Sequence, residues 1–221
     1  KDPVYFMKKY CWIQHPTRGR VQFNLYPFQE GALNLLQKND RNIILKSRQL
    51  GISTLSAGIS LWMMVFQKDK AILVVATKQD TAKNLVTKVK FMYDNLPSWL
   101  QIGFVENNKL ALRLKNGSQV KAVSAASDAG RSEAISLLII DEAAFIEENR
   151  IEEIWGSSQQ TLSTGGRAIV LSTPNGTGNF FHRMWTKAEE GANGFVPIRL
   201  PWTVHPERNQ EWRDKQDDEL G

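Results

Sequence analysis

The segment that most constrains this chain is a short loop of small, polar and basic residues between a strand pattern and a helix pattern. The loop reads Lys46-Ser-Arg-Gln-Leu-Gly-Ile-Ser-Thr54. Residues 42–45 before it form a strand-like run, and residues 55–66 after it form an apolar run typical of a helix. A strand, a loop of this kind and a helix in this order are the setting of a phosphate-binding P-loop.

The loop departs from the usual P-loop pattern, GxxxxGK[ST], at two positions. If Gly51 is the second glycine, Lys46 occupies the place of the first glycine and Ile52 stands where the phosphate-binding lysine is expected. Either Lys46 or Arg48 can direct positive charge at a phosphate from the other end of the loop. The loop N–H groups and the N-terminus of the following helix favour an anion by themselves. The alternative is an ordinary strand-turn-helix junction closed by Gly51.

A loop that binds ATP with Mg²⁺ also needs a hydroxyl group for the metal. Ser53 falls on the position that normally ligates Mg²⁺, and Thr54 follows it. The predicted phosphate-binding residues are Lys46, Ser47, Arg48, Gln49, Leu50, Gly51, Ile52, Ser53 and Thr54.

A second element, further along the chain, ends a strand pattern in two adjacent carboxylates. Residues 137–140 form an unbroken aliphatic run typical of a strand buried on both faces of a parallel sheet, and Asp141 and Glu142 follow. Burying two adjacent carboxylates costs free energy, so their presence there indicates a function. In the P-loop arrangement, Asp141 holds Mg²⁺ and Glu142 orients and polarises the water that attacks the γ-phosphate. The alternative is a strand that runs out into a solvated acidic turn.

Aromatic and amide residues upstream of the loop suit adenine. Gln29 can hydrogen-bond both the N6 amino group and N7 of the base, while Tyr26 or Phe28 covers the ring. The alternative is an ordinary helix entry, with Pro27 near its start and the aromatic residues in the core.

A polar loop follows another aliphatic strand pattern at residues 171–176, which read Leu-Ser-Thr-Pro-Asn-Gly. We expect this loop beside the carboxylate strand, where its polar side chains can touch the γ-phosphate or the attacking water. Such a loop can report whether the γ-phosphate is present. The alternative is a simple Pro-Asn-Gly turn.

A small, polar segment before the carboxylate strand contains a candidate arginine finger. Arg131 lies between Gly130 and Ser132, and an arginine there can reach the ATP of a neighbouring subunit. The alternative is a solvated surface arginine, and Arg48 competes for the finger role from within the P-loop. The predicted catalytic residues are Glu142, Arg131 and Arg48.

Strand and helix patterns alternate along the chain, which predicts a parallel sheet flanked by helices. Strands are expected at residues 42–45, 71–76, 137–140, 168–172 and 195–200. Helices are expected at residues 29–37, 53–66, 80–95, 151–162 and 179–190. Residues 110–123 alternate apolar and polar side chains around Asn116-Gly117, which is typical of a β-hairpin. We therefore expect an α/β fold of the P-loop NTPase class (ASCE or RecA-like), with a mainly parallel central sheet and an inserted β-hairpin.

Composition agrees with one catalytic domain without a disulfide or a thiolate metal cluster. Of the 221 residues, 42% are hydrophobic and 23% charged, which is ordinary for a globular protein. Cys11 is the single cysteine, and the three histidines show no ligand spacing. The longest apolar stretches are too short to span a bilayer, so we expect no membrane partner.

The charge balance is compatible with DNA as a partner. A net charge of +5 and a pI near 9.3 favour a polyanion. Lys78, Lys83, Lys88 and Lys90 can lie along one side of the helix expected at residues 80–95, or can simply be its solvated face, which is the more common case. Contact with duplex DNA would then be mainly to phosphates, weak in a monomer and strongly salt-dependent.

Three motifs together resemble the ATPase domain of the large terminase subunit, the DNA-packaging motor of tailed bacteriophages. They are KSRQLG at residues 46–51, LIIDEAAF at 138–145 and LSTPNG at 171–176. The resemblance extends over residues 26–205, most of the chain. Some members of that family carry the P-loop lysine at the start of the loop, so Lys46 is the matching position.

The resemblance implies a role for each motif. It assigns adenine contacts to Gln29 and its neighbours, Mg²⁺ binding to Ser53 and Asp141, and catalysis to Glu142. It assigns the coupling motif to Ser172, Thr173 and Pro174, and the trans-acting finger to Arg131. It further implies double-stranded DNA, a portal protein and a small terminase subunit as partners, in a ring, usually pentameric, on a procapsid in the host cytoplasm.

The resemblance also predicts how the chain is divided. Residues 1–205 are expected to form the ATPase domain, and residues 206–221 the start of a C-terminal linker region. Full large terminase subunits continue into an RNase H-like nuclease domain, which we do not expect in this chain.

Two other classes of protein remain as alternatives. A superfamily 2 helicase shares the glutamine, the P-loop, the Asp-Glu pair and a Ser-Thr-Pro-like motif, but it needs a second RecA-like domain. A non-hydrolysing nucleotide-binding module is compatible with Ile52, although Asp141 and Glu142 argue against it.

Overall fold

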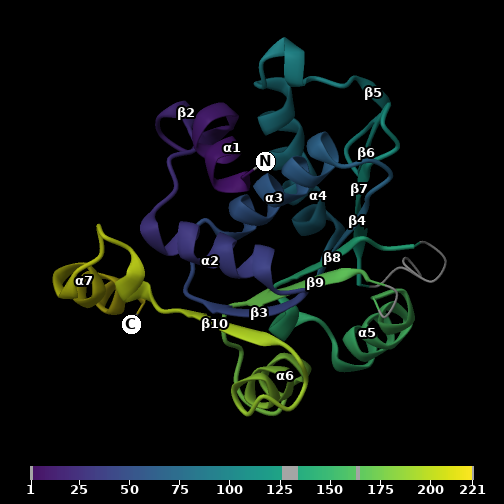
Figure 1. Cartoon of the computed structure of the whole chain (residues 1–221). Coiled ribbons are helices and arrows are strands. Elements are labelled where there is room, and N and C mark those ends of the chain that lie inside the picture. Colours follow the sequence, from purple (N-terminus) through teal and green to yellow (C-terminus); the bar gives the residue numbers. More distant parts are fainter. Residues whose placement is uncertain (1, 126–133, 163–164, 221) are drawn as a thin grey trace.

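A mixed sheet organises the chain in the computed structural model, which describes residues 2–125, 134–162 and 165–220. Within these residues, eight strands pair in the order β10-β3-β9-β8-β4-β7-β6-β5 (Figure 1). Pairing is parallel from β10 to β7 and antiparallel from β7 to β5. The strands are β3 (Arg41–Lys46), β4 (Ala71–Ala76), β5 (Phe104–Asn107), β6 (Ala111–Leu114), β7 (Gln119–Ser124), β8 (Leu137–Asp141), β9 (Arg167–Ser172) and β10 (Val196–Leu200).

Helices cover both faces of the sheet. The helices within the described residues are α1 (Pro3–Tyr10), α2 (Pro27–Lys38), α3 (Ile52–Phe66), α4 (Gln79–Asp94), α5 (Glu148–Leu162), α6 (Phe180–Glu189) and α7 (Gln210–Leu220), with short 3-10 turns at Ser98–Leu100, Ala143–Phe145 and Trp202–Val204. Figure 1 shows α2, α3 and α4 on one face and α5 and α6 on the other. This arrangement places the loops after the parallel strands at one edge of the sheet.

Two hydrophobic clusters lie on the two faces, and the buried strands divide their side chains between them. On β8, Leu137 and Ile139 belong to the cluster beneath α1 to α4, whereas Leu138 and Ile140 belong to the cluster beneath α5 and α6. Successive side chains of a strand point to opposite faces, so a strand buried on both sides is apolar throughout. The unbroken aliphatic run of β8 therefore follows from its central position.

The expected strands and helices are confirmed to within three residues at each end. The helix expected at residues 29–37 begins two residues earlier, with Pro27 as its first residue. The expected hairpin around Asn116-Gly117 is also confirmed as β6 and β7. Its second strand additionally pairs parallel with β4, so the hairpin extends the main sheet. The α/β architecture with an inserted hairpin is as predicted.

The N-terminal part contains elements that the sequence patterns did not predict. Helix α1 is followed by the two-stranded hairpin of β1 (Trp12–His15) and β2 (Gly19–Gln22). Side-chain hydrogen bonds anchor the hairpin, from Arg20 to Asn95 Oδ1 at 3.0 Å and from Gln22 to the carbonyl of Lys8 at 2.8 Å. The hairpin is thereby held next to the end of α4 and to α1.

The C-terminal segment returns to the P-loop. Arg208 donates hydrogen bonds to the carbonyl oxygens of Arg48 at 3.0 Å and Gln49 at 3.2 Å, and its guanidinium lies over the ring of Trp212 on α7. The backbone of the loop is therefore tied to the segment that follows β10. In the part of the chain that the structure describes, no helix has the length and apolar character needed to cross a bilayer.

Candidate nucleotide-binding site

The ends of three neighbouring strands bring the predicted site residues together. Strand β9 lies between β3 and β8, with Leu45 opposite Ser172 and Leu171 opposite Asp141. The carboxyl ends of parallel strands meet at one edge of a sheet, where open α/β folds bind ligands. The P-loop, the carboxylate pair and the Ser-Thr-Pro loop therefore share one site, as the sequence predicted.

Gly51 and Ile52 show why the loop departs from the common pattern without losing its shape. Gly51 has φ of +72° and caps the N-terminus of α3, and a Cβ atom there would lie 2.7 Å from Gln29 Nε2. This position therefore requires glycine. Ile52, which replaces the usual lysine, is buried in the hydrophobic core beneath α3. Its side chain supplies packing, so positive charge for an anion must come from elsewhere.

Lys46 supplies charge at the start of the loop. It is the last residue of β3, is only 7% exposed, and places Nζ 2.7 Å from Glu142 Oε1. A buried ammonium needs a partner, and here the partner is the predicted catalytic carboxylate. Arg48 is exposed and lines the same cavity as Lys46 and Glu142.

The other carboxylate oxygen of Glu142 is held by the loop after β9. Oε2 accepts hydrogen bonds from Thr173 N at 3.2 Å, Thr173 Oγ1 at 3.1 Å and Ser172 Oγ at 3.4 Å. Ser172 Oγ in turn accepts from Ala144 N at 3.1 Å. Burial acts to raise the pKa of Glu142, but the hydrogen bond and charge of Lys46 and the bonds from Thr173 outweigh it, so the pKa lies below its usual value. Glu142 is therefore an oriented carboxylate at neutral pH.

Asp141 is arranged differently from its neighbour. Ser53 Oγ donates a 2.8 Å hydrogen bond to Oδ2, while Oδ1 is buried and has no hydrogen-bond partner among the described residues. Burial raises the pKa of Asp141, although the bond from Ser53 and the charge of Lys46 act in the opposite direction. A buried carboxylate oxygen without a partner, beside a hydroxyl group, fits a hard cation such as Mg²⁺.

No group of three or more His, Cys, Asp or Glu side chains within the described ranges could hold a metal ion. A cation at Asp141 and Ser53 would therefore depend on oxygen atoms from a bound ligand or from water. P-loop sites bind Mg²⁺ in this manner, through few protein ligands and the substrate phosphates.

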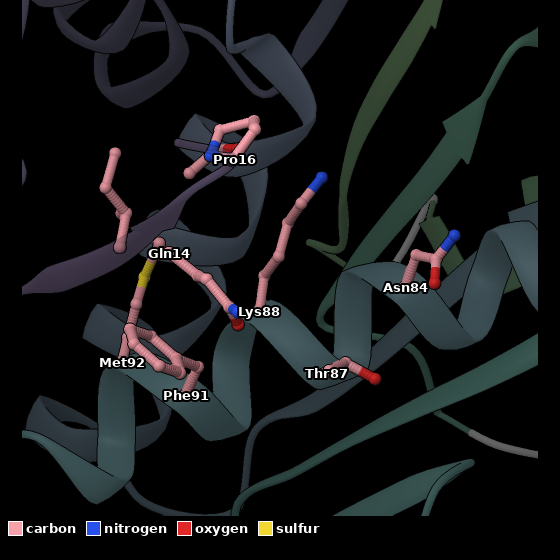
Figure 2. Close-up of a pocket in the computed structure, with 9 residues that line it drawn as sticks. Gln14, Pro16, Asn84, Thr87, Lys88, Phe91 and Met92 are labelled. Atoms are coloured by element: carbon pink, nitrogen blue, oxygen red, sulfur yellow. The ribbon is translucent and has the colours of Figure 1, made fainter. Parts of the chain in front are cut away.

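A cavity of about 600 Å³ opens over the P-loop and is lined by four parts of the chain, one of which is Glu142. The P-loop forms the floor, residues 13–16 of the β1 turn form one wall, and Lys88 of α4 projects from another. An adjoining cavity continues along α4 past Phe91 and Met92 (Figure 2). Glu142 also lines a further cavity, together with Arg48, Thr77, Lys78, Thr81, Phe145 and Thr173.

The residues expected at adenine occupy the start of α2. Gln29 is buried; its Nε2 donates to the Leu50 carbonyl at 2.9 Å, and its Oε1 accepts from Tyr26 N at 3.0 Å. The rings of Tyr26 and Phe28 are stacked with centroids 5.7 Å apart, and His205 lies against Tyr26 at 4.7 Å. Gln29 thus connects the helix to the P-loop, and its contact with adenine stays a prediction.

The remaining expected residues are placed as follows. Thr54 lines the cavity over the P-loop and the one that adjoins it. Pro174 is exposed beyond Thr173. Arg131 lies outside the described residues, so its role stays a prediction. Lys88 was not singled out from the other lysines of its helix, because the pattern of charges alone does not indicate which lysine faces a cavity.

The sheet order and the loop that joins β3 to α3 define the fold of a P-loop NTPase. The chain belongs to the family described as terminase large subunit, T4likevirus-type, N-terminal, whose model matches residues 43–218. This match confirms the family suggested by the three motifs.

Solved structures with the same fold include several large terminases. The HK97 bacteriophage large terminase superimposes with a TM-score of 0.73 at 17% identity, covering 96% of this chain and 45% of that one. The large terminase ATPase domain of Thermus phage P74-26 gives 0.70 at 20% identity, covering 88% of each chain. The UvsW helicase of bacteriophage T4 gives 0.59 at 14% identity, covering 90% of this chain and 67% of that one. This chain thus spans less than half the length of the HK97 protein.

Proposed function

We propose that this chain is a Mg²⁺-dependent ATPase whose hydrolysis of ATP drives translocation of double-stranded viral DNA into a procapsid. One observation carries the proposal: Glu142 is a carboxylate held between Lys46 and Thr173, directly beside the Asp141–Ser53 pair. Family membership and the likeness to a structure described as a terminase ATPase domain support the same activity.

The reaction follows from the contacts of Glu142 and Lys46. ATP binds with its phosphates on the loop N–H groups, and Lys46 exchanges its contact with Glu142 for one with a phosphate oxygen. Glu142, still held by Thr173, then accepts a hydrogen bond from a water molecule and orients it toward the γ-phosphorus. A bond forms from the water oxygen to phosphorus, the bond to the β,γ-bridging oxygen breaks, and the water proton passes to the carboxylate or to phosphate.

Ser53 and Asp141 are the residues that would hold Mg²⁺. When bound, the ion neutralises charge on the β- and γ-phosphates. In this proposal the unpartnered oxygen of Asp141 binds the ion, whose charge would offset the burial that raises the pKa of Asp141. In the same proposal Tyr26, Phe28 and Gln29 contact adenine.

Assembly completes the site in this proposal. Arg131 of a neighbouring subunit, or alternatively Arg48 of the same chain, stabilises charge on the transferred phosphoryl group. The motor would be a ring, pentameric in our proposal, docked on a portal protein with a small terminase subunit and contacting DNA mainly at phosphates. Residues 1–205 would be the ATPase domain and residues 206–221 the beginning of a linker.

A helicase-like ATPase is the second candidate, favoured by the likeness in fold to the UvsW helicase. The two candidates differ in what stimulates turnover. A packaging motor is stimulated by assembly into a ring, whereas a helicase is stimulated by nucleic acid without self-association.

Steady-state ATP hydrolysis across a range of protein concentrations tests the proposal. Specific activity should rise with concentration in the wild type, and Arg131→Ala should bind ATP normally while losing that rise. Lys46→Ala should be inactive throughout. Activity that is independent of concentration but rises with added DNA would favour the helicase alternative, and full stimulated turnover in Arg131→Ala would transfer the finger role to Arg48.

A further inference from the structure

Lys88 lies on α4 with its side chain in the cavity over the P-loop. It lines both this cavity and the adjoining one, together with Gln14, Pro16 and Thr54. Figure 2 shows its side chain extending from the helix, with the amine away from Phe91 and Met92. The amine therefore faces the same space as Lys46 and Glu142, which line the P-loop cavity.

The surroundings of Lys88 differ from those of the other lysines on its helix. Lys83 pairs with Asp80 at 3.0 Å and Lys90 with Asp94 at 2.7 Å, both on the surface. Among the described residues, the Lys88 amine has neither an ion pair nor a hydrogen bond. Burial lowers the pKa of Lys88; Asp141 acts to raise it, and Lys46 lowers it further. Partial burial of a cation without a direct partner costs free energy, and an anionic ligand beside the cation would offset this cost.

The P-loop sequence suggests a function for the Lys88 amine. Ile52 occupies the position of the usual phosphate-binding lysine and packs in the core, so this position provides no positive charge to the phosphates. Lys46 approaches the loop from β3, whereas Lys88 approaches the same cavity from α4. Two cations from different elements can thus neutralise a polyphosphate that carries several negative charges.

We propose that Lys88 contacts the phosphates of the bound nucleotide and supplies positive charge that the P-loop lacks at Ile52. The assignment rests on the proposed ATP site. A purely structural role, in which Lys88 only balances the charge of Asp141, would give different results, because phosphate affinity would then not depend on it.

Ligand binding by Lys88→Met, Lys88→Gln and Lys88→Arg tests the assignment. The ligands are ATP and inorganic tripolyphosphate, each with Mg²⁺, and binding is measured by titration calorimetry. A hydrogen bond to a charged group contributes enough that its loss should weaken binding of both ligands about ten- to hundredfold in the Met and Gln variants. Lys88→Arg keeps the charge and should bind within about threefold of the wild type. Lys83→Met, on the same helix but outside the cavity, should bind like the wild type.

Each outcome distinguishes this assignment from the proposed function. Wild-type binding by Lys88→Met, with loss of binding in Lys46→Ala, overturns the role of Lys88 and leaves the ATP site standing. If the wild type binds neither ligand, the ATP site itself is wrong. Removal of an unpaired, partly buried cation should not lower the melting temperature without nucleotide, so unfolding of both neutral variants would show a structural role and also overturn the assignment.

Discussion

Lys46 Nζ lies 2.7 Å from Glu142 Oε1, so the lysine expected to bind phosphate holds the glutamate expected to activate water. The two residues are 96 positions apart and come from the ends of β3 and β8, with the Ser172-Thr173 loop between them. In the proposed function, ATP therefore competes with Glu142 for the lysine. Binding of phosphate and release of the proposed catalytic carboxylate would then be the same event.

Substitution of Lys46 tests this competition. Lys46→Met should weaken ATP binding at least tenfold, because a charge-assisted contact with phosphate is lost. Glu142 would also lose the partner that lowers its pKa, so the pKa of Glu142 should rise. Titration calorimetry measures the first effect, and NMR of the glutamate side chain measures the second. Unchanged ATP affinity would make Arg48 or Lys88 the main phosphate contact.

The contributions of the two adjacent carboxylates to the free energy of unfolding should change with pH in opposite directions. The folded state lowers the pKa of Glu142, so Glu142 stabilises the fold above its unfolded pKa, about 4.3, and this contribution is lost as pH falls through the lower folded value. Glu142→Gln should therefore reduce stability without nucleotide at pH 7, modestly because the side chain is 29% exposed. Urea unfolding should show that the difference in free energy of unfolding between Glu142→Gln and the wild type becomes smaller at acid pH.

Ionisation of Asp141 should have the opposite effect on stability, because it should destabilise the fold. Its pKa is raised in the folded state, so the ionised side chain disfavours folding once pH exceeds the folded pKa, and the penalty disappears below the unfolded pKa, about 3.9. Asp141→Asn should consequently raise the melting temperature at neutral pH while abolishing Mg²⁺-dependent ATP binding. Lower stability of Asp141→Asn at pH 7 would mean that the bond from Ser53 outweighs burial.

Thr173 should affect turnover more than binding. Its hydroxyl and N–H both donate to Glu142 Oε2, and Thr173→Val removes only the hydroxyl. The loss of one hydrogen bond to a charged group corresponds to about ten- to hundredfold in kcat, with little change in ATP affinity. Thr177→Val, an exposed position in the same loop, is the control. A change confined to KM would place Thr173 at the nucleotide instead.

Arg208 should influence the P-loop from outside the site. Its two hydrogen bonds hold the carbonyls of Arg48 and Gln49, and Gln49 has φ of +59°, a conformation that needs support from its surroundings. Arg208→Ala should raise KM for ATP several-fold and increase amide hydrogen exchange in residues 47–51. Exchange rates equal to those of the wild type would show that the loop keeps its shape without this contact.

The sequence predicted the parts of the fold whose signals are local. The central residues of strands β3, β4, β8 and β9 are apolar, and the ends of β3, β8 and β9 with the loops that follow them contain the residues that meet in the site. The order of these strands in the sheet places Lys46, Asp141 and Thr173 at one edge, which explains why three separate motifs could be combined correctly.

Other features depend on contacts between distant segments. The β1–β2 hairpin is short and half-exposed, so its four-residue strands give little periodicity, and it is held by Arg20 and Gln22. The cavity wall that it forms makes Lys88 a lining residue rather than part of a solvated helix face. Likewise, the contact of Gln29 with Leu50 joins two segments whose proximity only the fold determines.

The central claim is that Glu142 activates the water that hydrolyses ATP. The most direct test is a single-turnover experiment, in which radiolabelled ATP is bound with Mg²⁺ to excess protein and the formation of ADP is followed. The wild type should convert the bound ATP, whereas Glu142→Gln should bind ATP with similar affinity and leave it uncleaved for at least a hundredfold longer. Cleavage by Glu142→Gln at the wild-type rate would contradict the account.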